Sequence, residues 1–391
     1  MIHVRVAQGV EDKLRSGFPW VYKQEIISYS KKPQKGELVV VRDYAGKFIG
    51  YGYINPDSTI TVRILSFDKE RKISERLVRE RIQKAYEYRK KLSINSNAYR
   101  LIHSEGDFLP GLVVDVYDRY LVVEFTTYGM HTLRDWVINA LIDILKPEGI
   151  YEKVSDSAKY IEGIPAEEGT IYGYVPEEVI IWEHDLKFIV NIPRGQKTGF
   201  FLDQRYARKM IRSLVKPGDR CLDVFCHTGG FALSMKKAGA GEVIGVDLSE
   251  GAIETAKRNA EINSLEGIQW VVDNAFDFLK RMHQEGQKFD IVVIDPPSFA
   301  KNKAAVPNAM RGYKELALRG LHITKPGGYL AVYSCSFHIT RDHLLKALLD
   351  AAKDAKKIVR VVGESIQDLD HPWILQMPNT LYLKGVYVEV L

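Results

Sequence analysis

The sequence predicts an α/β protein: a doubly wound, seven-stranded, Rossmann-like sheet in the C-terminal half, a small N-terminal β-barrel and a middle α+β domain. Three observations support this. Short strand-like runs fill the first 67 residues, and a hairpin, a helix and two more strands follow up to about residue 185. From Leu186 onward strand and helix patterns alternate, which is typical of a parallel doubly wound sheet. We therefore expect domains at 1–68, 69–186 and 187–391.

Composition narrows the class of protein. The chain has 391 residues, enough for two or three domains with cores of their own. Its apolar runs fall short of the roughly 18 residues of a membrane span, and its N-terminus lacks a signal-peptide pattern, so no membrane partner is expected. Cys221, Cys226 and Cys335 form neither a disulfide framework nor a Cys-x-x-Cys pair, which indicates a cytoplasmic protein. The histidines show no metal-ligand spacing, so no metal is expected.

The first domain is all-β in pattern. Residues 36–42 and 48–54 are strand-like and flank a turn, and a third strand is expected at 60–65. Basic and aromatic side chains gather near its start: Trp20, Tyr22, Lys23, Lys31, Lys32 and Lys35. Such side chains suit RNA through phosphate charge and base stacking, and a solvated loop is the alternative interpretation.

A helix is expected from Ser74 to Leu92, because its apolar side chains fall on one stripe at helical spacing: Val78, Ile82, Ala85 and Leu92. From residue 69 to residue 91 ten Lys or Arg stand against four Glu. Such an excess is typical of a solvated helix face, and it also suits a helix that follows a phosphate backbone.

The middle domain shows no chemistry of its own. Residues 112–117 and 120–125 predict a hairpin, and 132–145 a helix. Two further strands are expected around 150–154 and 170–175.

The third domain is expected to contain strands near 221–225, 242–246, 268–272, 290–294, 329–334 and 358–362. The tail, residues 380–390, alternates about a glycine, as a terminal antiparallel hairpin would. A doubly wound sheet that ends in this way is typical of methyltransferases.

One segment of this domain predicts a cofactor half-site. The strand 221–225 breaks into a turn with Gly229 and Gly230, a helix follows, and the next strand ends on Asp247. A carboxylate in this position accepts hydrogen bonds from ribose hydroxyls. The turn is not Gly-x-Gly-x-x-Gly, so a pyrophosphate is not expected. A cofactor with ribose and no phosphate fits, and S-adenosylmethionine is the common one.

Four groups of residues lie at the ends of successive strands of this sheet: Asp223 with the glycine turn, Asp247, residues 273–275 and residues 295–299. Ligands of open α/β sheets bind beyond the carboxyl ends of the strands, so these groups are expected to meet. A single aspartate at a strand end is more often a helix cap than a ligand, so the prediction of a cofactor site depends on all four groups occurring in this order. Asp247 is assigned to the ribose, and the residues after the third strand to the adenine amino group. The predicted cofactor-binding residues here are Asp223, Phe225, Gly229, Asp247, Leu248, Asp273, Asn274, Ala275 and Asp295.

Cys335 follows the fifth strand and overlooks the same expected crevice as Asp295. By default such a cysteine is a small buried apolar residue. A thiolate that adds to carbon 6 of a pyrimidine makes carbon 5 able to take a methyl group. A cationic or polar site favours the thiolate, and Asp295 is the candidate acid near N3 of the base, which must leave its stack. Cys221 and Cys226 are expected to pack.

The chain resembles, over essentially its whole length, the RlmI-type family of cytosine-C5 methyltransferases of large-subunit ribosomal RNA. Segments 19–22 and 36–65 resemble the family's PUA RNA-binding domain, and 105–115 resembles its middle domain. Segments 195–205 and 223–231 are the most specific. The resemblance implies that Gln196, Lys197, Thr198, Phe201, Asp203 and Arg205 close the cofactor site. It also implies that Cys335 is the nucleophile and that the partner is large-subunit rRNA or a precursor particle, with a homodimer as an option.

The chain departs from the family pattern at three positions, of which Phe18, where the family usually has His before Pro-Trp, matters little for chemistry. Ser298 follows Pro297 where many RNA cytosine-C5 methyltransferases carry a second cysteine, and Asn274 stands where an acid is expected. Two alternatives stay open: amino-group methylation of an RNA base by the Asp295–Phe299 motif, and a non-catalytic RNA-binding or ribosome assembly factor. The polar stretch 301–311 is expected to be a mobile substrate loop.

Overall fold

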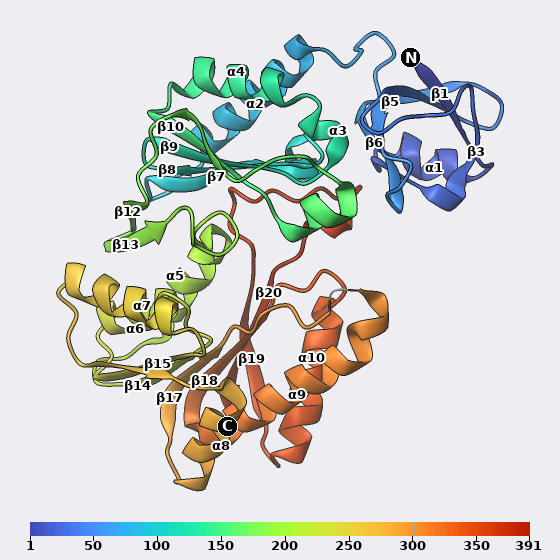
Figure 1. Ribbon diagram of the computed structural model, residues 1–391. Helices are drawn as coiled ribbons and strands as arrows, with labels where there is room; N and C mark the ends of the chain where they lie inside the picture. The colour runs from blue at the N-terminus through green and yellow to red at the C-terminus, as the bar shows by residue number, and fades with distance from the viewer. Residues whose placement is uncertain (301) are drawn as a thin grey trace. The chain divides into compact units, whose positions relative to one another are not determined.

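The computed structural model describes residues 1–300 and 302–391; Lys301, the first residue of the expected substrate loop, lies outside them. The chain divides into two compact units, and each is described by itself (Figure 1). Unit 1 comprises Met1–Ile181, Val190–Leu202 and Leu369–Thr380. Unit 2 comprises Trp182–Ile189, Asp203–Asp368 and Leu381–Leu391.

Unit 1 begins with a curled sheet. In the described part of the chain its six strands follow the order β2-β6-β5-β4-β1-β3. They are β1 (Ile2–Val6), β2 (Trp20–Tyr22), β3 (Ile26–Tyr29), β4 (Leu38–Arg42), β5 (Phe48–Ile54) and β6 (Ile60–Ser66). Alternate side chains of β1 are buried against Leu14 of α1 (Val10–Arg15), as expected of a strand with one face on a core. The three expected strands are confirmed, and β1–β3 complete the sheet.

The second sheet of unit 1 has the order β11-β10-β9-β8-β7. Its strands are β7 (Ala98–His103), β8 (Leu112–Tyr117), β9 (Tyr120–Phe125), β10 (Gly149–Lys153) and β11 (Gly169–Gly173), and its helices are α2 (Glu75–Lys91), α3 (Tyr128–His131) and α4 (Arg134–Leu145). The β8–β9 hairpin is confirmed. So is the helix stripe, because Val78, Ile82 and Ala85 are buried in the shared core. The Ser74 hydroxyl caps α2 by accepting a bond from the Leu77 amide. Strand β7 was not predicted, since its residues show no clear alternation.

A two-stranded sheet, β12 (Glu178–Glu183) and β13 (Leu186–Asn191), follows. It too was not predicted, although Val179, Ile181 and Glu183 of β12 are buried at alternate positions.

Unit 2 is built on a mostly parallel sheet in the order β16-β15-β14-β17-β18-β20-β19, seven strands among the described residues. They are β14 (Arg220–Val224), β15 (Glu242–Asp247), β16 (Ile268–Val272), β17 (Phe289–Ile294), β18 (Thr324–Ser334), β19 (Val359–Ile366) and β20 (Lys384–Val390). The predicted doubly wound sheet is therefore confirmed. From Lys384 onward the tail is a single strand, antiparallel to both β18 and β19, and Gly385 pairs with Tyr333 inside it, so the glycine forms no turn.

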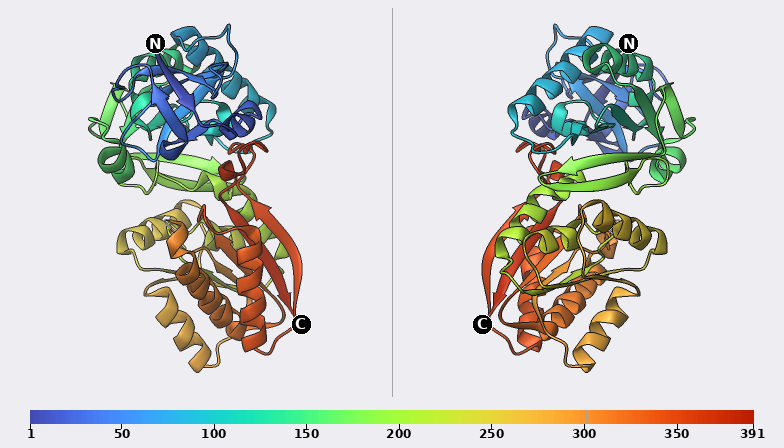
Figure 2. Two further views of the ribbon diagram at one scale, coloured as in Figure 1. Left: turned by 90° about the vertical axis from the view of Figure 1, so that its right-hand side faces the viewer. Right: turned by 90° about the vertical axis from the view of Figure 1, so that its left-hand side faces the viewer.

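Helices cover both faces of this sheet (Figure 2). They are α5 (Arg205–Leu214), α6 (Gly230–Lys237), α7 (Glu250–Ile262), α8 (Ala275–Gln284), α9 (Val306–Ile323) and α10 (Arg341–Asp354). Helices α5 and α6 bury one core, and α8 to α10 bury the other. Because both faces are covered, the central strands read as continuous apolar runs.

The stretch expected as a substrate loop is helical from Lys303 onward. Residues Lys303–Ala305 form a 3₁₀ turn, and α9 begins at Val306. The Asn302 side chain accepts a bond from the Ala305 amide, and Pro307 lies in the first helical turn, where its missing N–H costs nothing. These local signals override the polar composition that suggested a loop.

Within residues 1–300 and 302–391, no helix combines the length and the apolar character that a bilayer crossing requires.

Candidate active site

The turn after β14 is tightly constrained. Phe225, His227 and Gly229 have φ angles of 65°, 49° and 87°, in the left-handed region that favours glycine. A Cβ on Gly229 would lie 2.7 Å from the Trp270 ring, so a side chain there would have to displace the indole. The predicted order of strand, glycine turn and helix is confirmed, and α6 begins at Gly230.

Asp223 is fully buried at the base of this turn. One carboxylate oxygen, Oδ2, accepts a hydrogen bond of 2.8 Å from the Ala232 amide. The other, Oδ1, has no hydrogen-bond partner among the described residues. Burial, with the carboxylates of Asp295 and Asp247 acting in the same direction, raises the pKa of Asp223 to about 8. Three strand-end acids therefore converge on one place, as expected for parallel strands.

Asp247, the last residue of β15, orders the same turn. Its carboxylate accepts bonds of 2.9 Å from the amides of His227 and Ser249, one on each oxygen. Each oxygen keeps a second lone pair that can accept another donor. The next residue, Leu248, is 70% exposed, so its side chain is accessible to a ligand.

The polar side chains after β16 bind groups of helix α8. The Asn274 side-chain oxygen accepts bonds from the Phe276 and Asp277 amides at the start of α8. The Asp273 carboxylate accepts a bond of 2.7 Å from Arg281, and Ala275 is buried. The Asp273 amide donates to the Asp247 carbonyl, which keeps this turn beside the β15 end. Their expected contact with adenine stays a prediction.

Hydrogen bonds join the loop of Asp295 to the loop of Cys335. The Ser298 and Ser336 hydroxyls lie 2.9 Å apart, and the Asp295 amide donates to the Val224 carbonyl at the end of β14. The Gln204 side-chain amide donates to the Asp295 carboxylate at 2.9 Å. Cys335 follows β18 directly and is half-buried. A thiol and a carboxylate thus stand on neighbouring loops at one sheet edge.

The other two thiols are packed, as expected. Cys221 and Cys226 are 0% and 4% exposed, and burial raises the pKa of each thiol. Because a thiolate is the reactive form, neither is suited to attack a base.

The segment expected to close the cofactor site divides between the two units. In unit 1, Thr198 is buried and its hydroxyl donates to the Asp115 carboxylate, while the Lys197 ammonium lies 4.6 Å from the centre of the Phe201 ring. Gln196 also belongs to unit 1 and is exposed.

In unit 2, Asp203 accepts a bond of 2.6 Å from the Tyr382 hydroxyl, and Arg205 forms a 2.6 Å ion pair with Asp368. Each half of the segment is thus held within its own unit. A cofactor site shared by all six predicted residues stays a prediction.

A buried ion pair that the sequence did not suggest supports the turn from beneath. Arg208 of α5 binds both Glu183 oxygens, at 2.7 and 2.6 Å, and both side chains are 3% exposed. Burial by itself would raise the pKa of Glu183, but the Arg208 guanidinium holds it below its usual value. The side chain of Arg208 also lies under Gly230, 3.2 Å from where a Cβ would stand. No spacing in the sequence links residues 183 and 208.

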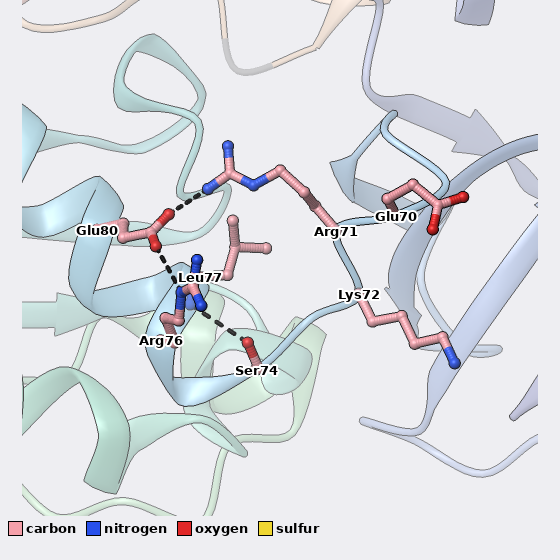
Figure 3. Close-up of a pocket in the computed structure, with 7 residues that line it drawn as sticks. All are labelled: Glu70, Arg71, Lys72, Ser74, Arg76, Leu77 and Glu80. Atoms are coloured by element: carbon pink, nitrogen blue, oxygen red, sulfur yellow. Dashed lines mark hydrogen bonds and ion pairs between the residues drawn. The ribbon is translucent and has the colours of Figure 1, made fainter.

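A hollow lies in unit 1, at the start of α2 (Figure 3). It encloses about 300 Å³ and is lined by Glu70, Arg71, Lys72, Ser74, Arg76, Leu77 and Glu80. Arg71 and Arg76 both bind Glu80, so one carboxylate offsets one of their two positive charges. The lining carries no thiol, and its groups suit neither nucleophilic attack nor a ribose contact.

Comparisons with known proteins match both ends of the chain. Residues 4–67 match a PUA-like domain, and residues 169–369 match the S-adenosylmethionine-dependent methyltransferase family. The chain is 35% identical over 395 residues to ribosomal RNA large subunit methyltransferase I of Enterobacter sp. (strain 638), and both chains are covered completely. It is 37% identical to the protein of that name from Tolumonas auensis, with 97% of each covered. The chain belongs to the ribosomal RNA large subunit methyltransferase I family.

A solved structure shares the fold of the whole chain. SMU.776, complexed with SAH, superimposes with a TM-score of 0.88 at 24% identity and covers 100% of both chains. This likeness supports the fold described above, including the curled PUA-like sheet and the methyltransferase sheet.

S-adenosylmethionine is the cofactor of this family member, and the residues present fit it. The cofactor carries positive charge on its sulfonium and its ammonium group. Asp223 offers a buried oxygen without a hydrogen-bond partner, in a field that Asp247 and Asp295 make more negative. A cationic donor would bind that oxygen and favour the ionised form of a carboxyl that burial and the two neighbouring carboxylates otherwise keep protonated.

Proposed function

We propose that the protein methylates carbon 5 of a cytosine in large-subunit ribosomal RNA, with Cys335 as nucleophile. The curated relatives named above support the substrate class. The observation that carries the mechanism is the hydrogen bond between Ser298 and Ser336, which keeps the Asp295 and Cys335 loops adjacent.

Cofactor binding is assigned to the turn and the strand ends of unit 2. We assign Asp223 to the cationic part of S-adenosylmethionine and Asp247 to its ribose hydroxyls, because a carboxylate after the second strand suits that role. When bound, the cofactor supplies an electrophilic methyl group. Leu248, Phe225 and Gly229 shape the space around it, with Trp270 behind the glycine.

The chain's own residues then activate the base. The Cys335 thiolate forms a bond to carbon 6, and the electron pair of the 5,6 double bond moves to carbon 5. Asp295 shares a proton with N3, which stabilises the adduct. After the methyl group is received, the proton on carbon 5 leaves to a base, the bond from sulfur to carbon 6 breaks, and the thiolate is restored. The target base has to leave its stack to reach the thiol.

RNA binding is assigned to the PUA-like domain. Its fold supports this, as does the group of basic and aromatic side chains around Trp20: the Arg63 guanidinium lies 5.6 Å from the Trp20 ring centre, and Lys13 lies 4.9 Å from that of Tyr22. We propose domain boundaries at 1–68, 69–186 and 187–391.

Nucleoside analysis tests the proposed function. Large-subunit RNA that lacks the modification is treated with the protein and a labelled methyl donor, then digested and analysed by mass spectrometry. We expect labelled 5-methylcytidine from the wild type and none from Cys335→Ala, with cofactor affinity unchanged. Full activity of the variant, or label in N-methylated bases, would favour amino-group methylation by the Asp295–Phe299 motif. Cofactor binding without methyl transfer to any RNA would favour the non-catalytic assembly factor.

A further inference from the structure

Lys384 has an unusual position for a lysine. It is the first residue of β20 and pairs with Ser334, the last residue of β18, so it lies across from the residue that precedes Cys335. The next residue, Gly385, packs closely against its neighbours, since a Cβ there would lie 2.5 Å from atoms of Ser365 and Tyr333. Lys384 is 7% exposed, although lysine is rarely buried.

The Lys384 ammonium is bound to the turn that follows the thiol. Nζ donates to the carbonyl of Ser336 at 2.9 Å and to that of Ile339 at 2.5 Å. From the other side, the Ser336 hydroxyl bonds to Ser298, and the Tyr313 hydroxyl of α9 donates to Ser334 at 2.8 Å. The turn that carries Cys335 is therefore held between β20 on one side and the Asp295 loop and α9 on the other.

Charge links the two side chains as well. Burial lowers the pKa of Lys384 to about 8, and the Cys335 thiolate acts in the opposite direction. At neutral pH the lysine therefore remains mostly protonated. Its strand neighbours, Ser334 and Ile366, carry no charge. Other ionisable groups near the turn include its own His338, which is half-buried, and His343, whose ring nitrogen accepts a bond from the Thr340 amide. Tyr313, whose pKa burial raises, and the Asp295 carboxylate, which acts on Tyr313 in the same direction, lie on the elements packed against it.

We propose that Lys384 is a positioning residue for methyl transfer, which holds the turn of Cys335 through two carbonyls and supplies the positive charge that favours its thiolate. This rests on the proposed role of Cys335. A cation beside a thiol stabilises the charged form. Here the cation is Lys384 of β20, and the register of β20 with β18 places its ammonium group at the turn.

The wild-type protein provides the first test. Alkylation of Cys335 by iodoacetamide is followed by peptide mass spectrometry from about pH 6 to about pH 9.5, with Cys221 and Cys226 as buried internal references. A synthetic peptide spanning residues 329–341 serves as the unfolded reference. We expect the midpoint of the alkylation profile to lie about one pH unit below that of the peptide. An equal or higher midpoint overturns the proposal, whatever the variants do.

Two variants separate charge from packing. Lys384→Met should move the midpoint upward by about one unit and slow alkylation at pH 7 about tenfold. Lys384→Arg keeps the charge and should stay within about threefold of the wild type. Lys346→Met, which removes an exposed lysine of α10, is the matched control and should change nothing. Binding of S-adenosylhomocysteine checks that each variant is folded. A Lys384→Met profile that overlays the wild type, in a variant that binds normally, overturns the proposal.

This test and the test of function fail separately. If Cys335→Ala still methylates RNA fully while Lys384→Met shifts the alkylation midpoint, the proposed nucleophile is wrong, and with it the part of Lys384 in methyl transfer. If Cys335→Ala is inactive and Lys384→Met leaves the midpoint in place, the nucleophile stands and the charge role of Lys384 is overturned.

Discussion

Replacement of Asp223 by asparagine should stabilise the cofactor-free protein near neutral pH while it weakens cofactor binding. The wild-type carboxyl is fully buried, and burial raises its pKa from the ordinary 3.8 to about 8. A group whose pKa is raised on folding contributes stability below its unfolded pKa and loses it as pH rises through the folded value. At pH 7 Asp223 is ionised in the unfolded chain and protonated in the folded chain. This difference lowers the free energy of unfolding by about 4 kcal/mol.

Asparagine removes this cost and keeps the bond from the Ala232 amide, since its side-chain oxygen can accept in place of Oδ2. It also puts an amide nitrogen where Oδ1 had no partner, which costs about 1–3 kcal/mol. The net gain at pH 7 is therefore about 1–3 kcal/mol. At pH 5 the titration cost of the wild type falls to about 2 kcal/mol, so the variant loses most or all of its advantage.

Hydrogen exchange of the β14 segment measures this effect locally, because exchange there requires the sheet to open. We expect slower exchange in the variant than in the wild type at pH 7. The ratio of the wild-type exchange rate to that of the variant should change by roughly 50-fold between pH 7 and pH 5. Asp277→Asn, which alters an exposed carboxylate of α8, is the control and should show no such change. A ratio that does not vary with pH would refute the reasoning, because it would mean that the buried carboxyl does not titrate in this range.

The same variant should bind S-adenosylmethionine roughly 30-fold more weakly, because the wild-type carboxyl can lose its proton when the cationic cofactor binds, whereas an amide cannot become charged. Calorimetric titration at pH 7 measures this. Unchanged affinity would show that Asp223 does not contact the charged part of the cofactor.

Three further predictions concern the support of the site. Gly229→Ala should destabilise unit 2 by about 1–2 kcal/mol through the left-handed φ alone, and the contact of the new Cβ with Trp270 should add to this. The variant should also shift the indole fluorescence, and an unchanged unfolding midpoint would contradict the prediction. Glu183→Gln should cost about 3–5 kcal/mol, because it leaves the Arg208 guanidinium buried without its counter-charge, and a urea midpoint equal to that of the wild type would contradict this. Ser298→Ala should lower kcat about fivefold, the worth of one hydrogen bond of about 1 kcal/mol, with cofactor affinity kept; a loss of affinity instead would place Ser298 in the cofactor site.

The convergence of the strand-end acids could be predicted from the sequence. Parallel strands end at one edge of a sheet, so Asp223, Asp247 and Asp295 had to meet once the alternation of strand and helix was recognised. The structure adds the strength of their interaction, since the pKa of Asp223 depends on its depth of burial and on the other two carboxylates. The sequence offers no measure of depth.

The loop at 301–311 and the tail show where composition misleads. Polar residues suggested a loop, but a capping Asn302 and Pro307 in the first turn start a helix. The alternation about Gly385 suggested a hairpin, whereas Lys384–Val390 form one strand inserted between β18 and β19. In the first segment the deciding cap and proline lie inside the window itself, whereas in the tail the deciding neighbours, β18 and β19, lie outside the window in which a pattern is read.

By itself the sequence determined the alternation of strands and helices in the methyltransferase domain, the glycine turn of the proposed cofactor site and the acids beyond it, because each depends on neighbours within a few residues or on the common edge of a parallel sheet. Only the tertiary structure decided which distant side chains share a site. Lys384 meets the turn of Cys335 because β20 pairs with β18 in one particular register. Arg208 meets Glu183 because α5 packs beside the end of β12. Register and packing depend on the whole fold, and no local pattern encodes them.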